Sequence, residues 1–256
     1  MSGCGCAGHD LLPVAQVIEH LLSRAPAPPK VEFVALEDAL GRVLAEDVLA
    51  PRDVPAWDNS AMDGYALRAA DLPLEGGFLP LAGRIAAGDS GQTQLLAGHA
   101  VRIFTGAPLP PGADSVVAQE DCRAENDGVW LPAVKVGAHV RTQGEELRTG
   151  SLLLIAGQRL RPQEVGLLAS IGMAQVPVYR RLRVGLLSSG DELREPGQTL
   201  APGQIYNANR FSLGAVLRSL GLEVHDYDVM ADDLAASRDA LSLAASEWDM
   251  LLTSGG

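Results

Sequence analysis

The alternation of short apolar runs with amphipathic stretches after residue 180 is the feature that most constrains the fold. Three apolar runs have the length of buried strands: 182–187, 222–227 and 249–252. The stretches between them have the periodicity of helices, at 207–220 and 232–246. Strands that are joined through helices pair in parallel with right-handed crossovers, so the sequence predicts a βαβαβ unit with a parallel sheet.

Small polar residues follow the first and the third of these strands. They are Ser188, Ser189 and Gly190 after the first strand, and Ser254, Gly255 and Gly256 after the third. Turns of this kind at the carboxyl edge of a parallel sheet expose N–H groups that bind phosphate or other oxyanions. Asp191 and Glu192 come next, and they would hold a divalent cation beside the anion or act as a base. Ordinary α/β connections also contain Ser and Gly, so each turn alone is weak support.

A second polar segment, Trp57 to Tyr65, has neither the period of a helix nor that of a strand. Its Asn, Ser, Asp and Gly residues are turn formers, so an ordered loop is expected. Asp58 and Asp63 lie five positions apart with Asn59 and Ser60 between them, and such oxygen donors suit a hard cation or the orientation of a proton. The same residues also suit a tight turn between domains whose side chains cap their own backbone.

The fold class expected for the whole chain is a multidomain α/β plus β protein. Short apolar runs separated by Gly and Pro predict an inserted β-rich domain at 51–144, with its clearest strands at 101–104 and 116–118 around a rigid turn. The flanking segments 10–50 and 145–178 are expected to form one elongated α+β body. Its predicted elements are helices 10–24, 36–40 and 162–171 and strands 31–35, 43–49, 152–155 and 175–179. Residues 1–9 form a flexible tail and 179–256 an incomplete, doubly wound α/β domain.

Charge and composition exclude several classes of partner. The formal charge of -12, with only 20 Lys and Arg residues scattered through the chain, argues against nucleic acid and anionic membranes. No apolar run reaches the about 18 residues of a membrane span, and no signal peptide is apparent, so a cytoplasmic protein is expected. Cys4 and Cys6 with His9 could hold a soft metal, or they belong to a mobile terminus.

Several motifs occur together along the chain: Asp58 to Ala66, Thr105 to Pro108 with Gly112 to Asp114, Gly144 to Glu146, Ser189 to Leu193, Asn207 to Asn209, Asp232 with Asp233, and Ser254 to Gly256. In this order they closely resemble the molybdopterin molybdenumtransferase family, the MoeA and gephyrin E-domain proteins. The resemblance implies the insertion of molybdate into adenylated molybdopterin with release of AMP, in a magnesium-dependent step. It also implies that a molybdopterin adenylyltransferase supplies the substrate.

The resemblance also implies a homodimer, in which the loops at Asp58 and Thr105 of one subunit face the α/β domain of the other. The acidic candidates for catalysis are Asp58, Asp63, Glu146, Glu192 and Asp233, of which Asp58 and Glu192 would bind the metal. Phosphate or pterin would contact Thr105, Ser188, Ser189, Gly190, Asp191, Ser254, Gly255 and Gly256. Glu146 stands where many relatives have Asp, which lengthens the side chain.

Members of this family continue well beyond the second Ser/Gly turn, so a truncated copy or a fragment without activity of its own is expected. Two other functions remain open. A non-catalytic dimeric scaffold would not require acids at Asp58, Asp63 and Glu192. A molybdopterin adenylyltransferase would not require the inserted β-rich domain with its acidic loop.

Overall fold

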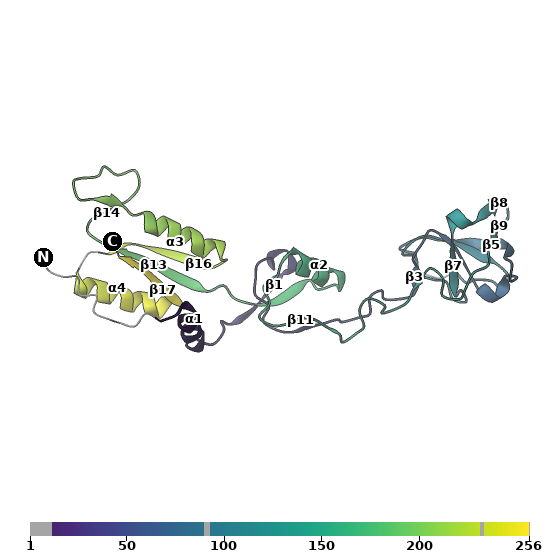
Figure 1. The fold of residues 1–256 in the computed structure, drawn as a ribbon, viewed down its shortest axis with the longest axis horizontal. Coiled ribbons are helices and arrows are strands. Elements are labelled where there is room, and N and C mark those ends of the chain that lie inside the picture. The colour runs from purple at the N-terminus through teal and green to yellow at the C-terminus, as the bar shows by residue number, and fades with distance from the viewer. Residues whose placement is uncertain (1–11, 90–92, 231–232, 256) are drawn as a thin grey trace. The chain divides into compact units, whose positions relative to one another are not determined.

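A computed structural model describes residues 12–89, 93–230 and 233–255 (Figure 1). The chain divides into two compact units, of which one is Glu46–Ala174 and the other combines Met1–Ala45 with Gln175–Gly256. Within the described ranges, no helix is both long enough and apolar enough to span a membrane.

The unit Glu46–Ala174 contains a six-stranded mixed sheet. Its order is β7-β4-β6-β5-β9-β8, with β5 and β6 parallel and the other neighbours antiparallel. The strands are β4 (Gly64–Leu67), β5 (Gly77–Ile85), β6 (Ala100–Ile103), β7 (Ser115–Ala118), β8 (Arg123–Glu125) and β9 (Gly128–Leu131). The short 3-10 helices η2 (Ala69–Asp71) and η3 (Gln119–Asp121) follow β4 and β7.

Both faces of this sheet are apolar near β4, because successive residues of a strand point to opposite faces. One cluster includes Tyr65, Leu67 and Val117, and the other includes Ala66, Ile103 and Val116. All four residues of β4 are buried, and this strand pairs with β6 on one side and with β7 on the other.

Two small strand pairs and a helix complete this unit. β3 (Asn59–Ser60) pairs with β10 (Val140–Arg141), and β2 (Val48–Leu49) pairs with β11 (Leu152–Leu154). Helix α2 (Pro162–Ser170) begins with proline, whose missing N–H costs nothing in the first turn, and Glu164 accepts the backbone N–H of Arg161. The chain leaves α2 through Gly172, where φ is +84°.

The other unit contains an antiparallel pair and a parallel sheet. β1 (Val31–Ala35) pairs with β12 (Gln175–Tyr179), and the 3-10 helix η1 (Leu36–Asp38) follows β1. Helix α1 (Val14–Ser23) has an apolar stripe but no buried residue. Leu193–Arg194 (β14) and Ile205–Tyr206 (β15) form a further small pair.

The parallel sheet has the order β16-β13-β17, made of β13 (Arg183–Ser189), β16 (Glu223–Met230) and β17 (Met250–Gly255). Helices α3 (Ala208–Ser219) and α4 (Leu234–Glu247) connect these strands. The two connections run in opposite directions across the sheet, so right-handed crossovers put the helices on opposite faces, as Figure 1 shows. The first connection leads from β13 to a strand on one side of it, and the second leads to a strand on its other side, so the strand order switches at β13. Open parallel sheets bind ligands at such a switch point, outside the carboxyl ends of the strands.

The structure confirms the predicted βαβαβ order and the strands expected at 31–35, 101–104, 116–118, 152–155 and 175–179, within a residue or two. The strand predicted at 43–49 is wrong in part, since Val48–Leu49 is a strand and Leu44 forms only an isolated bridge with Val178. Asp47 instead accepts the N–H of Ala156 at 2.8 Å, a side-chain bond that competes with a ladder. The prediction of a loop without strand from Trp57 to Tyr65 is also wrong in part, because pairing with β10 and β7 overrides the turn-forming residues.

Candidate functional site

Two neighbouring strands bring the predicted Ser and Gly residues together at the carboxyl edge of the parallel sheet. Ser188 pairs with Ser254, and Ser189 pairs with Gly255. The prediction that these residues form turns is wrong, because β13 and β17 continue through them and use backbone groups in the ladder. Gly256 lies outside the described residues.

Glu192 folds back over the end of β13. The backbone of Gly190 has φ +145°, and a Cβ atom at this position would lie 2.7 Å from both carboxylate oxygens of Glu192. A side chain here would push the flexible carboxylate aside, and the positive φ itself favours glycine. The backbone oxygen of Glu192 accepts the N–H of Ile205 at 2.9 Å, which ties this turn to β15. Its carboxylate has no hydrogen-bond partner among the described residues.

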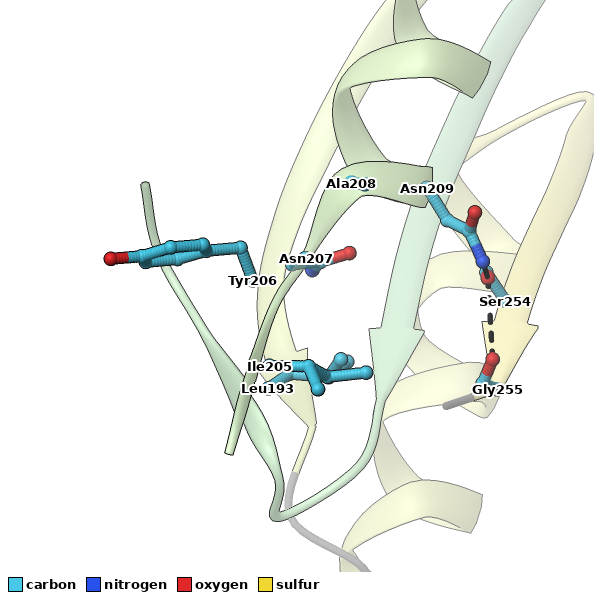
Figure 2. A pocket seen from close by; sticks show the side chains of 8 residues that line it. All are labelled: Leu193, Ile205, Tyr206, Asn207, Ala208, Asn209, Ser254 and Gly255. Atoms are coloured by element: carbon cyan, nitrogen blue, oxygen red, sulfur yellow. Dashed lines mark hydrogen bonds between the residues drawn. The ribbon is translucent and has the colours of Figure 1, made fainter. Parts of the chain in front are cut away.

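A pocket of about 170 Å³ opens beside this edge (Figure 2). Figure 2 shows Leu193 and Ile205 together on one side, and Asn209 turned toward Ser254 on the other. Asn209 Nδ2 donates to Ser254 Oγ at 3.0 Å. The remaining lining residues are Tyr206, Asn207, Ala208 and Gly255. The pocket thus combines an apolar floor with amide and hydroxyl groups from α3 and β17.

Asn207 caps α3 and also carries an unused donor. Its Oδ1 accepts the N–H of Arg210 at 3.2 Å, which satisfies one free amide at the start of the helix. Asn207 Nδ2 and Ser188 Oγ are buried without a partner among the described residues, and each residue is only 2% exposed. Buried polar groups of this kind are normally paired, so they are places where a ligand could be bound.

Two other predicted residues of this unit lie outside the pocket. Asp191 is exposed, and its backbone oxygen accepts from Arg194 at 2.9 Å. Asp233 is exposed directly before α4, where its backbone oxygen accepts the N–H of Ser237. Asp232 lies outside the described residues, as do Cys4, Cys6 and His9.

In the unit Glu46–Ala174, Asp63 and Thr105 are in direct contact. Asp63 Oδ1 accepts both the backbone N–H and the hydroxyl of Thr105 at 2.8 Å each. The backbone N–H of Thr105, followed by its hydroxyl, holds the pKa of Asp63 below its ordinary value. Since the threonine hydroxyl and N–H are both donated to Asp63, this pair fixes the turn after β6 and keeps the carboxylate charged.

Asp58 is held by a segment that lies far along the chain. Its Oδ1 accepts the backbone N–H of Gln143 at 2.7 Å, and the Gln143 side chain donates to Asp53 Oδ2 at 3.0 Å. Asp53 also accepts the N–H and the hydroxyl of Thr149 at 2.8 Å, and the N–H of Thr149 is the main reason why the pKa of Asp53 is lowered. The sequence reasoning missed Asp53 and Gln143, because neither belongs to a motif.

Glu146 lies in the same segment but points elsewhere. Its backbone N–H donates to Val54 at 2.9 Å, and its exposed carboxylate has no partner in the described part of the chain. No group of three or more His, Cys, Asp or Glu side chains in the described residues converges in a way that would hold a metal ion.

Two family models match the chain. One is described as "MoeA N-terminal region (domain I and II)" and matches residues 12–172, and the other is described as "Probable molybdopterin binding domain" and matches residues 185–256. The second match contains the parallel sheet and its pocket, while the first contains Asp58, Asp63 and Thr105.

Named relatives agree with these matches. The chain is 40% identical over 248 residues to the molybdopterin molybdenumtransferase of Haemophilus influenzae, covering 96% of this chain and 61% of that protein. It is 38% identical over 247 residues to the protein of that name from a Nostoc species, covering 94% and 57%. A crystal structure titled as the molybdopterin biosynthesis moea protein from Pyrococcus horikosii has a TM-score of 0.84 at 33% identity, covering 96% and 64%.

The chain therefore spans about six tenths of the length of the curated relatives that it matches. Its MoeA-like fold and its match to both family models, which together cover most of its residues, lead to one assignment. The chain belongs to the MoeA family of molybdopterin molybdenumtransferases.

Proposed function

We propose that this protein acts in molybdenum cofactor biosynthesis by inserting molybdate into adenylated molybdopterin, with release of AMP. The observation that carries the proposal is the carboxyl edge of the parallel sheet. There, the carboxylate of Glu192, which has no partner among the described residues, lies beside a pocket lined with amide and hydroxyl groups. An anionic substrate and an acid that binds a cation are the groups that such an edge accommodates.

The pocket residues take the role of binding and orientation. Asn207, which lines the pocket, and the buried Ser188 would donate from Nδ2 and Oγ, which have no partner among the described residues, to phosphate or pterin heteroatoms near the start of α3. Thr105, Ser189, Gly190, Asp191, Ser254, Gly255 and Gly256 remain proposed contacts of the substrate. The narrow volume of about 170 Å³ fits part of a ligand, so the rest would lie outside it.

The acids take the role of holding Mg²⁺ and moving protons. Asp58 has one carboxylate oxygen free of hydrogen bonds to the described residues, and Glu192 has both, so each can donate an oxygen ligand to a hard cation. When bound, the cation would neutralise negative charge on oxyanion groups. Asp63 would fix the Thr105 turn, while Glu146 and Asp233 remain candidates on exposed positions.

We also propose that the protein is a cytoplasmic homodimer that takes its substrate from a molybdopterin adenylyltransferase. Exposed apolar side chains on and beside α1 support an interface: Leu12, Val14, Ile18, Leu21 and Leu22. Ile18→Asp should convert the dimer to a monomer in light scattering, whereas Gln16→Asp should not.

The domain arrangement is also proposed: segments 10–50 and 145–178 form one body, into which 51–144 is inserted.

The activity test removes the charge of Glu192 while keeping its shape. In the complete gene product, Glu192→Gln should lower molybdenum insertion at least about a hundredfold, the usual scale for an acid or base. The matched control is Glu223→Gln, at the first residue of β16 and so at the amino edge of the same sheet. Near-normal turnover of Glu192→Gln with purified adenylated molybdopterin would remove Glu192 from the site.

A mixing experiment tests whether Asp58 and Glu192 act together across two subunits. Asp58→Asn and Glu192→Gln proteins, mixed under conditions of subunit exchange, should recover activity because a heterodimer keeps one intact site. If labelled subunits exchange and activity stays at the level of the single variants, the two acids do not share a site between subunits.

A further inference from the structure

Two arginine and two aromatic side chains lie together on one face of the six-stranded sheet. The guanidinium carbon of Arg102 lies 4.9 Å from the ring centre of Tyr65 and 4.8 Å from that of Phe104. The guanidinium carbon of Arg84 lies 4.7 Å from the ring centre of Phe104. The two cations share one aromatic ring, so their carbons are at most 9.5 Å apart.

Strand pairing places these cations side by side. Arg84 of β5 and Arg102 of β6 are direct partners in the parallel register, so both side chains lie on the same face. Phe104 lies two residues beyond Arg102, and its N–H donates to Ile85 at 3.2 Å. Arg102 is held further by the backbone oxygen of Gly64 at 3.0 Å and by Gln119.

Neither cation is neutralised by an ion pair with a carboxylate that the structure describes. The charge of Arg102 contributes to the lowered pKa of Asp63, but the two residues form no ion pair, and Asp63 Oδ1 accepts from Thr105. Like charges at directly paired positions of a sheet are destabilising. This pair is notable in a chain of net charge -12, which offers many carboxylates elsewhere.

A third arginine of the same sheet contacts an aromatic ring but is paired with a carboxylate. Arg123 of β8 also lies over an aromatic ring, at 5.4 Å from the ring centre of Trp130. There, Glu125 forms an ion pair with Arg123 and also accepts the Trp130 N–H. Stacking of arginine on an aromatic ring thus occurs here with a neutralising carboxylate, and the Arg84–Arg102 pair has none among the described residues.

We propose that Arg84 and Arg102, held by Phe104, form a binding site for a phosphate-type dianion. Contact with the ring of Phe104 holds both guanidinium groups in place, and a guanidinium binds phosphate through paired hydrogen bonds from the N–H donors at its edge. The positive charges of Arg84 and Arg102 would balance the two negative charges of the dianion. A dianion between two guanidinium groups spans about 8 Å from carbon to carbon at ordinary hydrogen-bond lengths, a distance that the exposed Arg84 side chain reaches. The site does not depend on the proposed function.

The test is a titration of the 256-residue chain with inorganic phosphate, methyl phosphate and succinate, followed by NMR of the arginine side chains at constant ionic strength. Saturable shifts of the Arg84 and Arg102 signals are expected with phosphate, with methyl phosphate, or with both. Tighter binding of methyl phosphate would identify a phosphate ester as the ligand, and tighter binding of inorganic phosphate would identify the free ion.

The variants separate a built site from general attraction to positive charge. Arg84→Gln should weaken phosphate binding at least about tenfold, as expected for losing charged hydrogen bonds. Phe104→Leu should also weaken it, although the net charge is unchanged, while the matched control Arg123→Gln should have no effect. The proposal is overturned by shifts that do not saturate, by equal effects of Arg84→Gln and Arg123→Gln, or by succinate binding as tightly as phosphate.

Discussion

Gly64 leaves no room for a side chain against the neighbouring strand of the six-stranded sheet, so Gly64→Ala tests how that sheet supports the Asp63–Thr105 contact. A Cβ atom at this position would lie 2.0 Å from the backbone oxygen of Val117 and 2.9 Å from its carbonyl carbon. Both atoms belong to the backbone of β7, so no side-chain rotation relieves the overlap. The methyl group can be accommodated only if β4 and β7 separate.

The size of the effect follows from this overlap. Restoring an ordinary contact of 3.4 Å requires a displacement of about 1.4 Å. A shift of this size lengthens a 2.9 Å hydrogen bond beyond any useful range, and each lost bond costs about 1 kcal/mol. With two ladder bonds lost and the packing of Tyr65 disturbed, we expect a loss of at least about 3 kcal/mol.

The assay is hydrogen exchange of peptides from β4, β6 and β7, because a chain with two compact units need not unfold in one step. Gly166→Ala is the matched control. It is the same substitution in the same unit, within α2, where a Cβ atom would meet nothing within 4 Å. Alanine there should stabilise α2 by about 0.5–1 kcal/mol, since glycine is a poor helix former.

The two variants must therefore change stability in opposite directions. If Gly64→Ala lowers the opening free energy of β4 and β7 by less than about 1 kcal/mol, the strands tolerate the methyl group and the argument from close approach is wrong. If Gly166→Ala is equally destabilising, the effect reflects the loss of glycine in general.

Three further outcomes are expected. The lowered pKa of Asp63 contributes stability that is present above its ordinary value of 3.8 and is lost as the pH falls through the folded pKa. Protection of the Thr105 amide, measured against the exchange rate of an unstructured amide at the same pH, should therefore fall at low pH, and Asp63→Asn should remove this dependence. Asn207→Ala should destabilise α3 by about 1 kcal/mol in hydrogen exchange, and Asn207→Asp, which keeps the acceptor, should cost less. Asp53→Ala should release Gln143 and Thr149 and accelerate exchange of the Gln143 amide, whereas exchange in α2 should stay unchanged.

Local patterns were sufficient to predict the parallel unit. Each of its strands and helices has a periodicity of its own, and the crossover rule then fixes how they pair. The ends of β13 and β17 were not predictable in this way, because Ser188, Ser254 and Gly255 are poor strand formers alone. They become strand residues because the two strands pair with each other along their full length.

The candidate site was predictable only where its residues lie in motifs. Asp58, Asp63 and Glu192 were predicted because each of these carboxylates lies among turn-forming residues, a pattern that can be seen in the sequence. Asp53 and Gln143 gave no such signal, since their importance comes from a hydrogen bond between positions 90 residues apart. Arg84 and Arg102 were missed for a similar reason, because only the register of β5 and β6 makes them neighbours.

Several polar side chains of the candidate site are held by partners that are remote in sequence. Asp58 accepts from a residue 85 positions away, Asp63 from one 42 positions away, and Asn209 donates to one 45 positions away. Each of these bonds exists only while a strand pair or a helix keeps its partner in place. Mutations in the apolar strands should therefore disturb the acids before the units unfold, because exposed hydrogen bonds break at a lower free energy than the core. Loss of the proposed activity without loss of the fold is consequently the expected result of mild damage to β4, β6 or β13.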